Sequence, residues 1–401
     1  MGALSAVSTY TLTCSNAAGV TAFRTVTINI TYPSDYIPAW AKPLHTNQWV
    51  ELTGTMMSAL DPCPSRDQVL CPYIGNGGQA AIMGSWGGGA YDTKRDRLII
   101  WGGGHADYGG NEIYTFDIVN MSWTMEIPPT MTTPGDRAGT GGNTGTHYHD
   151  GTPSSRHTAS ALVYAGGGVD RFFSMSAGAV FGDPSHTGYD VDSFNFDTKT
   201  WKTDWVGSAG GYDGAQAPVA AYHPGSGHIW YHAGGSSPLM EFDATFGATG
   251  KWTTYAESQL SIEASALIDT KRNRFVVLGG AYFGNLNSQL LVFNLASPNT
   301  APERPASYGN SNGLALESRQ GVGFIYDPIG DRYLAWDGGA TVYVLNPDTW
   351  EWTILPLYSA NMATPSGAEA TGTYGRFAYV PRLHGVIVVS RTTENVFFLK
   401  L

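Results

Sequence analysis

Short runs that alternate apolar and polar residues recur from about residue 80 to the C-terminus, and turn residues separate them. One unit of this pattern holds a Tyr-Asp-type turn, a basic residue opening an apolar run, a glycine cluster, an aromatic run ending in Asp or Asn, and a Trp. Six copies follow one another, beginning near residues 89, 161, 220, 266, 323 and 377. Alternation bounded by turns is typical of β-strands, so each copy predicts four short strands, labelled a to d in chain order.

Repeated four-stranded units of about 50 residues are typical of β-propeller blades, and the order of the motifs resembles the kelch repeat. The sequence therefore predicts an all-β, six-bladed, kelch-like β-propeller over residues 47–401. The sixth copy stops at Leu401, before its strand d. Residues 47–52 (NQWVEL) match strand d of the fifth copy (TWEW, 349–352), so we expect this N-terminal strand to complete the last blade. Such closure removes an open sheet edge, which would otherwise favour aggregation.

The segment before the propeller has a different pattern. Residues 8–31 alternate on both sides of an Asn-Ala-Ala-Gly turn, which predicts a β-hairpin. This hairpin resembles the last two strands of a bacterial immunoglobulin-like domain. We interpret residues 1–31 as the truncated tail of such a domain and the proline-rich residues 32–46 as a linker.

Composition narrows the class of protein. Glycine accounts for 51 of 401 residues and aromatic residues for 12%, whereas charged residues are only 14%. Disorder requires few aromatic residues and high charge, collagen requires glycine at every third position, and coiled coils are rich in Ala, Glu, Lys and Leu. None of these classes fits. The net charge of −11 argues against a nucleic-acid partner, and no apolar run is long enough to predict a membrane span.

The three cysteines bear on the cellular compartment. Cys63 and Cys71 flank a proline-containing loop (DPCPSRDQVLCP), and we expect a local disulfide there if the protein is secreted, with two free thiols as the alternative. We expect a secreted or extracellular protein, although this chain carries no signal peptide at Met1. The cysteines lack CxxC spacing, which disfavours a thiolate zinc site.

Loop chemistry distinguishes the two faces of the predicted ring. In an antiparallel blade the b–c loops and the d–a connections emerge on one face, and the short a–b turns emerge on the other. The chemically rich segments all belong to the first face: they carry His105, Tyr108, Asn111, His147, His149, Arg156, His157, Tyr212, Tyr282 and Arg319. We therefore expect the functional site there.

These residues also have structural interpretations. The alternatives are that His105 bonds to turn backbone, that Arg156 and His157 make a contact between blades, and that His147 and His149 belong to a solvated loop. The glycines before His105 favour a site, because they let the backbone approach a ligand closely. His147 and His149 have metal-ligand chemistry, so we consider a divalent cation there, zinc or calcium, although the expected catalysis requires no cofactor.

Several reaction classes do not suit the sequence. No close pair of carboxylates is evident, which disfavours ordinary glycoside hydrolysis, and no GxSxG motif marks a serine hydrolase. All cysteines precede the first complete blade, which excludes copper oxidases of the kelch type that carry a Tyr–Cys group in a blade. His, Tyr and Arg together suit proton abstraction beside a carboxylate, as in β-elimination from a uronic acid.

The segments GGGHADYGGNEIYTFD and SSRHTAS resemble secreted bacterial and phage propellers, among them polysaccharide lyases of the ulvan-lyase type. The resemblance implies β-elimination from a uronic-acid polysaccharide, with His105 and His157 as catalytic or carboxylate-neutralising residues. It implies that Arg156 pairs with the substrate carboxylate and that Tyr108 is the base or acid, with Tyr212 and Tyr282 as alternatives. The six predicted blades depart from the seven expected in that group.

A polysaccharide is thus the expected partner of a monomeric protein. We expect it to be bound by Asn111, His149, Tyr212, Tyr282 and Arg319. Despite the acidic chain, we expect the face to be positive through Arg156, Arg319, Arg376 and Arg391. The main alternative is a non-catalytic glycan-binding propeller, an adhesin or phage surface module whose aromatic residues stack on sugars. A glycosidase of unusual mechanism is a third hypothesis.

Overall fold

The computed structural model describes residues 8–15, 21–28, 33, 36–136, 146–175, 179–187, 190–207, 217–280 and 289–401. The chain divides into two compact units, Met1–Pro43 and Leu44–Leu401. The first unit contains the predicted hairpin, formed by the antiparallel strands β1 (Ser8–Ser15) and β2 (Thr21–Ile28). Its origin in a truncated immunoglobulin-like domain stays a prediction.

The second unit is an all-β, six-bladed β-propeller, as the repeat predicted. Blades one to three are β4 (Gly89–Asp92), β5 (Arg97–Ile100), β6 (Ile113–Asp117) and β7 (Ser122–Ile127); β8 (Leu162–Ala165), β9 (Arg171–Met175), β12 (Val191–Asn195) and β13 (Thr200–Lys202); and β14 (Val219–His223), β15 (His228–His232), β16 (Gly235–Asp243) and β17 (Lys251–Leu260). Blades four to six are β18 (Ser265–Asp269), β19 (Arg274–Leu278) and β20 (Leu290–Asn294); β22 (Gly323–Asp327), β23 (Arg332–Trp336), β24 (Tyr343–Leu345) and β25 (Glu351–Ile354); and β26 (Phe377–Val380), β27 (Gly385–Val388), β28 (Val396–Lys400) and β3 (Gln48–Leu52).

The connections between these strands contain shorter strands and helices. A two-stranded sheet of β10 (Ala179–Val180) and β11 (Asp183–Thr187) lies in the b–c loop of blade two, and β21 (Tyr308–Gly309) pairs with β25. The helices are α1 (Ala81–Gly84), α2 (Ser311–Ala315) and short 3-10 turns at Met57–Leu60, Gly78–Ala80, Pro134–Asp136, Leu316–Ser318, Tyr374–Arg376 and Pro381–Leu383. Among the described residues, no helix has the length and apolar character needed to cross a membrane.

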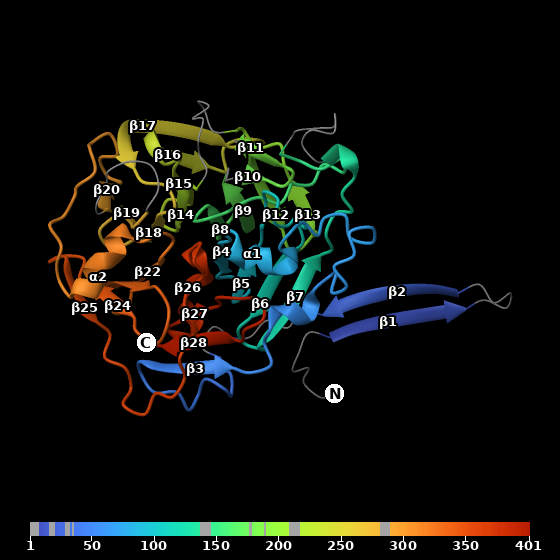
Figure 1. Ribbon diagram of the computed structural model, residues 1–401, viewed down its shortest axis with the longest axis horizontal. Coiled ribbons are helices and arrows are strands. Elements are labelled where there is room, and N and C mark those ends of the chain that lie inside the picture. Colours follow the sequence, from blue (N-terminus) through green and yellow to red (C-terminus); the bar gives the residue numbers. More distant parts are fainter. Residues whose placement is uncertain are drawn as a thin grey trace. The chain divides into compact units, whose positions relative to one another are not determined.

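The ring is closed by the N-terminal strand. Strand β3 pairs antiparallel with β28, so that Gln48 lies opposite Lys400 and Leu52 lies opposite Val396. The indole of Trp49 is buried and donates to the carbonyl of Ala340 at 2.9 Å. Figure 1 shows the six sheets round a common centre, with β3 beside β28. The inner strand of each blade contacts the inner strand of the next, and β26 contacts β4, so no inner edge stays open.

Blade four departs from the prediction of four strands per copy. Its sheet has three strands among the described residues, and only an isolated bridge between Val292 and Glu303 continues it. The two backbone hydrogen bonds of that bridge measure 3.0 and 2.9 Å. This copy is also the one whose strand d lacks a Trp, so no large indole is present to anchor an outer strand there.

Both faces of each sheet are apolar because each blade packs between two neighbours. Phe173 and Met175 of blade two, for example, share a buried cluster with Tyr231, Met240 and Phe242 of blade three. This double burial explains the low charge content, since charged side chains are almost never fully buried unless they are paired.

An arginine of the a–b turn links neighbouring blades on the a–b face. Arg95 of blade one donates to both carboxylate oxygens of Asp170 in blade two, at 2.8 and 2.9 Å. Arg272 of blade four makes the same bidentate contact with Asp331 in blade five, at 2.8 and 3.0 Å. These motifs are therefore architectural, which leaves the opposite face for function.

Candidate functional site

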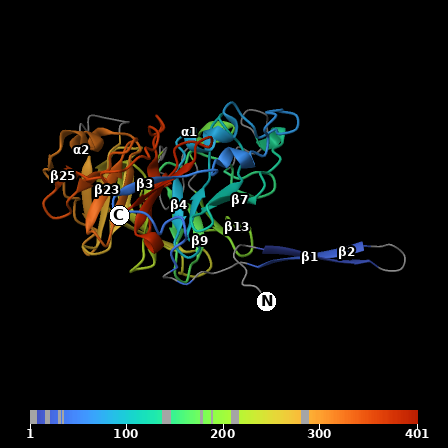
Figure 2. The same cartoon turned by 90° about the horizontal axis from the view of Figure 1, so that it is seen from below.

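The d–a connections meet at the centre of the predicted functional face. Ala159, Ala217, Ile262 and Tyr374 form one buried cluster against which Trp86 packs, and each comes from a different connection. In the side view of Figure 2, α1 and α2, which also belong to d–a connections, lie toward the same edge of the ring. This convergence brings residues that are far apart in sequence to one central surface.

A run of glycines brings the first b–c loop against this centre. Gly102, Gly103, Gly104 and His105 all have positive φ, at 122, 131, 45 and 55°. A Cβ at Gly104 would lie 2.4 Å from the Cα of Arg156. Because only glycine tolerates both the backbone conformation and this close approach, the run fixes where His105 emerges.

His105 and His157 lie side by side, although they come from separate segments. Their ring centroids are 5.4 Å apart and the ring planes are inclined by 49°. The backbone amides of both residues donate to the carbonyl of Ala179 in β10, each at 3.2 Å. The structure thus brings together the two histidines that the sequence placed on one face.

Asp107 completes this cluster. Its Oδ2 lies 3.6 Å from Nε2 of His157 and 3.9 Å from Nδ1 of His105. In the part of the chain that the structure describes, these three are the only group of three or more His, Cys, Asp or Glu residues whose ligand atoms all lie within 4.8 Å of one another. The neighbouring His157 is the main cause that lowers the pKa of Asp107 below its ordinary value, with Ser85 and His105 contributing. We call His105, Asp107 and His157 the HDH cluster.

The HDH cluster is exposed to solvent on one side and covered by Trp86 on the other. The side chains of His105, Asp107 and His157 are 41, 32 and 12% exposed, respectively. The indole of Trp86 packs on His157 with ring centroids 4.8 Å apart, and its Nε1 donates to Glu263 at 2.7 Å. A molecule at this face therefore reaches His105 first, while His157 is held from behind.

Arg156 is fully buried, contrary to its expected contact with a substrate carboxylate. Its guanidinium donates to the carbonyls of Ser154 and Thr146 at 3.0 and 2.7 Å, and it lies 3.4 Å from Asp192. These contacts tie the segment that precedes His157 to β12 of blade two. The geometry gives Arg156 a positioning role.

Tyr108 is also fully buried. Its hydroxyl donates to Oε1 of Glu112 at 2.7 Å, and burial raises the pKa of the phenol. Tyr114 donates to the same oxygen at 3.0 Å, and burial raises the pKa of Glu112 to about 7. A phenol in these surroundings does not reach a molecule bound at the surface, so the structure does not support Tyr108 as the base.

The residues expected to bind substrate lie in different environments. Asn111 is buried, and its amide donates to Thr152 at 2.8 Å and to the carbonyl of Pro153 at 3.0 Å. Arg319 is exposed and its Nε lies 3.4 Å from Asp337. Tyr212 and Tyr282 lie outside the described residues.

The histidines expected to bind metal are not brought into one ligand group. His147 Nε2 lies 2.8 Å from Asp192, whereas His149 Nδ1 lies 2.8 Å from Asp136. Neither belongs to the HDH cluster, the one ligand group found among the described residues. A metal at His147 and His149 therefore lacks geometric support. The side chain of His149 is half-exposed.

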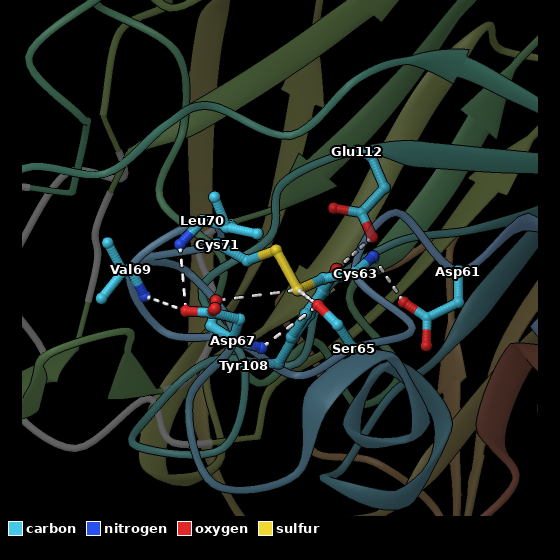
Figure 3. Close-up of a disulfide and its surroundings, with 9 residues drawn as sticks. All are labelled: Asp61, Cys63, Ser65, Asp67, Val69, Leu70, Cys71, Tyr108 and Glu112. Atoms are coloured by element: carbon cyan, nitrogen blue, oxygen red, sulfur yellow. Dashed lines mark hydrogen bonds between the residues drawn. A yellow bond between two sulfur atoms is a disulfide. The ribbon is translucent and has the colours of Figure 1, made fainter.

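The predicted disulfide between Cys63 and Cys71 is present. Figure 3 shows it beside Tyr108 and Glu112. The segment that follows the disulfide is hydrogen-bonded to the b–c loop of blade one. The amide of Gly77 donates to the Asp107 carbonyl at 2.8 Å, and the amide of Gly109 donates to the Tyr73 carbonyl at 2.7 Å. The disulfide thus supports the backbone that carries the cluster.

Two members of this surface were undervalued by sequence reasoning. No site role is assigned to Asp107 or to Trp86 from the sequence alone. The available signals were the His-x-Asp spacing from His105 to Asp107 and an aromatic residue just before a glycine run in a d–a connection.

Comparisons with known proteins do not assign this chain to a family. No family model and no curated protein matches the sequence. Among solved structures, a fungal alcohol oxidase with catalytic diversity among the AA5 family, in complex with copper, is 14% identical with a TM-score of 0.44. The match covers 78% of this chain and 62% of the oxidase, so the chain spans less than two thirds of that protein. A likeness of this extent carries no functional argument.

Proposed function

We propose that this protein is a polysaccharide lyase that cleaves a uronic-acid-containing polysaccharide by β-elimination at the HDH cluster. The observation that carries the proposal is the convergence of His105 and His157, whose ring centroids are 5.4 Å apart. Two imidazoles at one open position suit a substrate whose negative charge must be neutralised and whose reaction requires proton transfer.

The reaction makes three demands on the site. A base removes the C5 proton, the electron pair forms the C4–C5 double bond, and the C4–O bond breaks while the leaving oxygen takes up a proton. The carboxylate at C5 must be neutralised so that negative charge can develop beside it. We assign this neutralising role to His105 and His157, because their rings combine partial exposure with a fixed position.

The remaining roles follow from burial. Arg156 and Tyr108 support the cluster from beneath and do not contact the substrate. We assign proton abstraction to Tyr212 or Tyr282, the alternatives to Tyr108 named in the sequence analysis. His149 and Arg319, which are partly exposed, are the substrate-binding residues of this proposal.

We also propose that the protein acts outside the cytosol. The disulfide between Cys63 and Cys71 supports this, since such bonds persist mainly in oxidising compartments. An extracellular location suits an enzyme whose substrate is a polysaccharide.

The test is product analysis on a panel of polyuronates. We expect the ultraviolet absorbance of an unsaturated uronate, and we expect His105→Ala and His157→Ala to lower the rate by at least about 100-fold. His228→Ala is the matched control, because His228 lies at the start of β15 on the a–b face and pairs with Glu241. Its rate should equal that of the unmodified protein.

Three other outcomes contradict the proposal. Release of reducing ends without the absorbance would identify a glycosidase. Binding on a glycan array without any product would identify a non-catalytic glycan-binding propeller. Equal activity of all three alanine variants would place the reaction elsewhere on the ring.

A further inference from the structure

We propose that His105, Asp107 and His157 bind one divalent transition-metal ion, with zinc as the best match. The geometry of the three side chains supports metal binding independently of any reaction. The function of the ion, which is to neutralise the substrate carboxylate, rests on the proposed lyase activity.

The spacing of the ligand atoms suits such an ion. Tetrahedral coordination with bonds of about 2.0–2.1 Å places ligand atoms roughly 3.3–3.4 Å apart. Asp107 Oδ2 lies 3.6 Å from His157 Nε2 and 3.9 Å from His105 Nδ1, and all three ligand atoms lie within 4.8 Å of one another, so movement of the side chains toward a common centre completes the geometry. Three protein ligands leave a fourth position open, as in catalytic zinc sites.

The donor set indicates which class of ion binds. Two imidazole nitrogens and one carboxylate oxygen suit zinc and its transition-metal neighbours. Calcium and magnesium prefer sites made of oxygen ligands, so the same cluster disfavours them. The site thus differs in residues from the pair His147 and His149 that the sequence suggested.

An unpartnered buried atom is the second observation that points to a ligand. Nε2 of His157 is buried and has no hydrogen-bond partner, since Asp107 at 3.6 Å is too far for one. The ring cannot easily turn away, because Trp86 packs on it and the His157 amide is held by Ala179. Buried polar atoms are nearly always satisfied, and a metal ion would satisfy this one.

The arginines of this face are already paired, which leaves a role for a bound cation. Of the four arginines expected to make the face positive, Arg156 and Arg376 are fully buried and donate to backbone carbonyls. Arg319 and Arg391 are ion-paired with neighbouring carboxylates. An acidic substrate on this acidic chain therefore gains from a cation that those arginines do not supply.

The experiment measures binding by the full chain. After dialysis against a chelator, Zn²⁺ is titrated and counted by elemental analysis, and Co²⁺ is titrated while its visible absorption and the tryptophan fluorescence are followed. We expect one ion per chain, cobalt bands of a four- or five-coordinate site, and a change in fluorescence as the ion binds His157 beneath Trp86.

Matched variants decide which residues bind. Asp107→Asn and His157→Gln keep the size of the side chain, and we expect each to weaken the affinity for Zn²⁺ by more than the 10–100-fold that loss of an outer partner costs. His149→Ala should bind like the unmodified protein, because its ring contacts Asp136 outside the cluster. Thermal unfolding and circular dichroism identify any variant that fails to fold.

The outcomes separate this proposal from the lyase proposal. Unchanged Zn²⁺ affinity in both folded cluster variants, or loss of binding in His149→Ala, overturns the metal site. Lyase activity that persists in chelator without bound metal overturns the metal's role and leaves the lyase intact, with the imidazoles themselves neutralising the carboxylate. Stoichiometric binding without product on any polyuronate overturns the lyase and leaves the metal site intact.

Discussion

The backbone amides of His105 and His157 donate to one shared acceptor, the carbonyl of Ala179, at 3.2 Å each. The carbonyl of His105 in turn accepts from the amide of Gly182, at 2.8 Å, on the same hairpin connection. The hairpin of β10 and β11, which belongs to blade two, therefore holds the b–c loop of blade one beside the d–a connection that carries His157. The two histidines meet because one short insertion binds both of their backbones.

Replacement of Gly104 is predicted to lower both the stability and the activity of the protein. Gly104→Ala places a Cβ 2.4 Å from the Cα of Arg156 at a φ of 45°, so we expect a loss of at least about 2 kcal/mol in the free energy of unfolding, together with loss of activity. Urea denaturation measures the first effect. Gly227→Ala is the control, because φ is 79° there with nothing within 4 Å of the Cβ, and it should cost only about 1 kcal/mol. Equal costs in the two variants would contradict the steric argument.

Arg156 is predicted to act through stability and position. Arg156→Met removes its bonds to the carbonyls of Ser154 and Thr146 and leaves Asp192 without its nearby cation, so we expect a cost of about 3 kcal/mol. Arg156→Lys should recover only part of it, since one ammonium cannot reproduce the planar fork. Urea denaturation of both variants checks this. A Met variant as stable as the unmodified protein would show that the buried guanidinium stabilises nothing.

Glu112 is predicted to make stability depend on pH. Burial raises its pKa from 4.5 to about 7 in the folded state, so the folded protein favours the protonated form. This contribution is fully present below the unfolded pKa near 4.5 and is lost as the pH rises through about 7. Glu112→Gln, which stays neutral, should therefore be more stable than the unmodified protein at pH values above about 7, by on the order of 3 kcal/mol. The difference should vanish near pH 4, where both side chains are neutral.

Parallel urea denaturation series across that pH range measure this difference. A constant difference at all pH values would show that Glu112 does not titrate within it. Glu51→Gln, a change at an exposed position in β3, controls for the loss of one negative charge.

The disulfide is predicted to stabilise the site loop. Cys63→Ser with Cys71→Ser opens a short loop, for which chain entropy gives a loss of about 2–3 kcal/mol. Because Gly77 and Gly109 bind the backbone around Asp107, Zn²⁺ affinity should fall along with the melting temperature. Calorimetry and the Zn²⁺ titration measure both. A variant with lower stability but unchanged affinity would show that the disulfide region does not position the cluster.

The sequence alone determined the architecture of the ring. Strand alternation, the Trp and glycine positions and the match between 47–52 and 349–352 predicted six blades and the pairing of β3 with β28, because register and closure follow from local periodicity. The prediction of four strands in every copy was wrong for blade four, whose sheet has three strands among the described residues. His105 and His157 could be placed on one face because antiparallel strands alternate in direction.

Only the tertiary structure decided which loop side chains face outward. Tyr108, three residues after His105, turns inward to Glu112, and Arg156, directly before His157, turns inward to Thr146, whereas His105 stays partly exposed. An irregular loop has no periodicity from which such directions can be read. They are set by long-range hydrogen bonds, such as those to the Ala179 carbonyl, and by the packing of Trp86 on His157, contacts that exist only once the blades have closed into a ring.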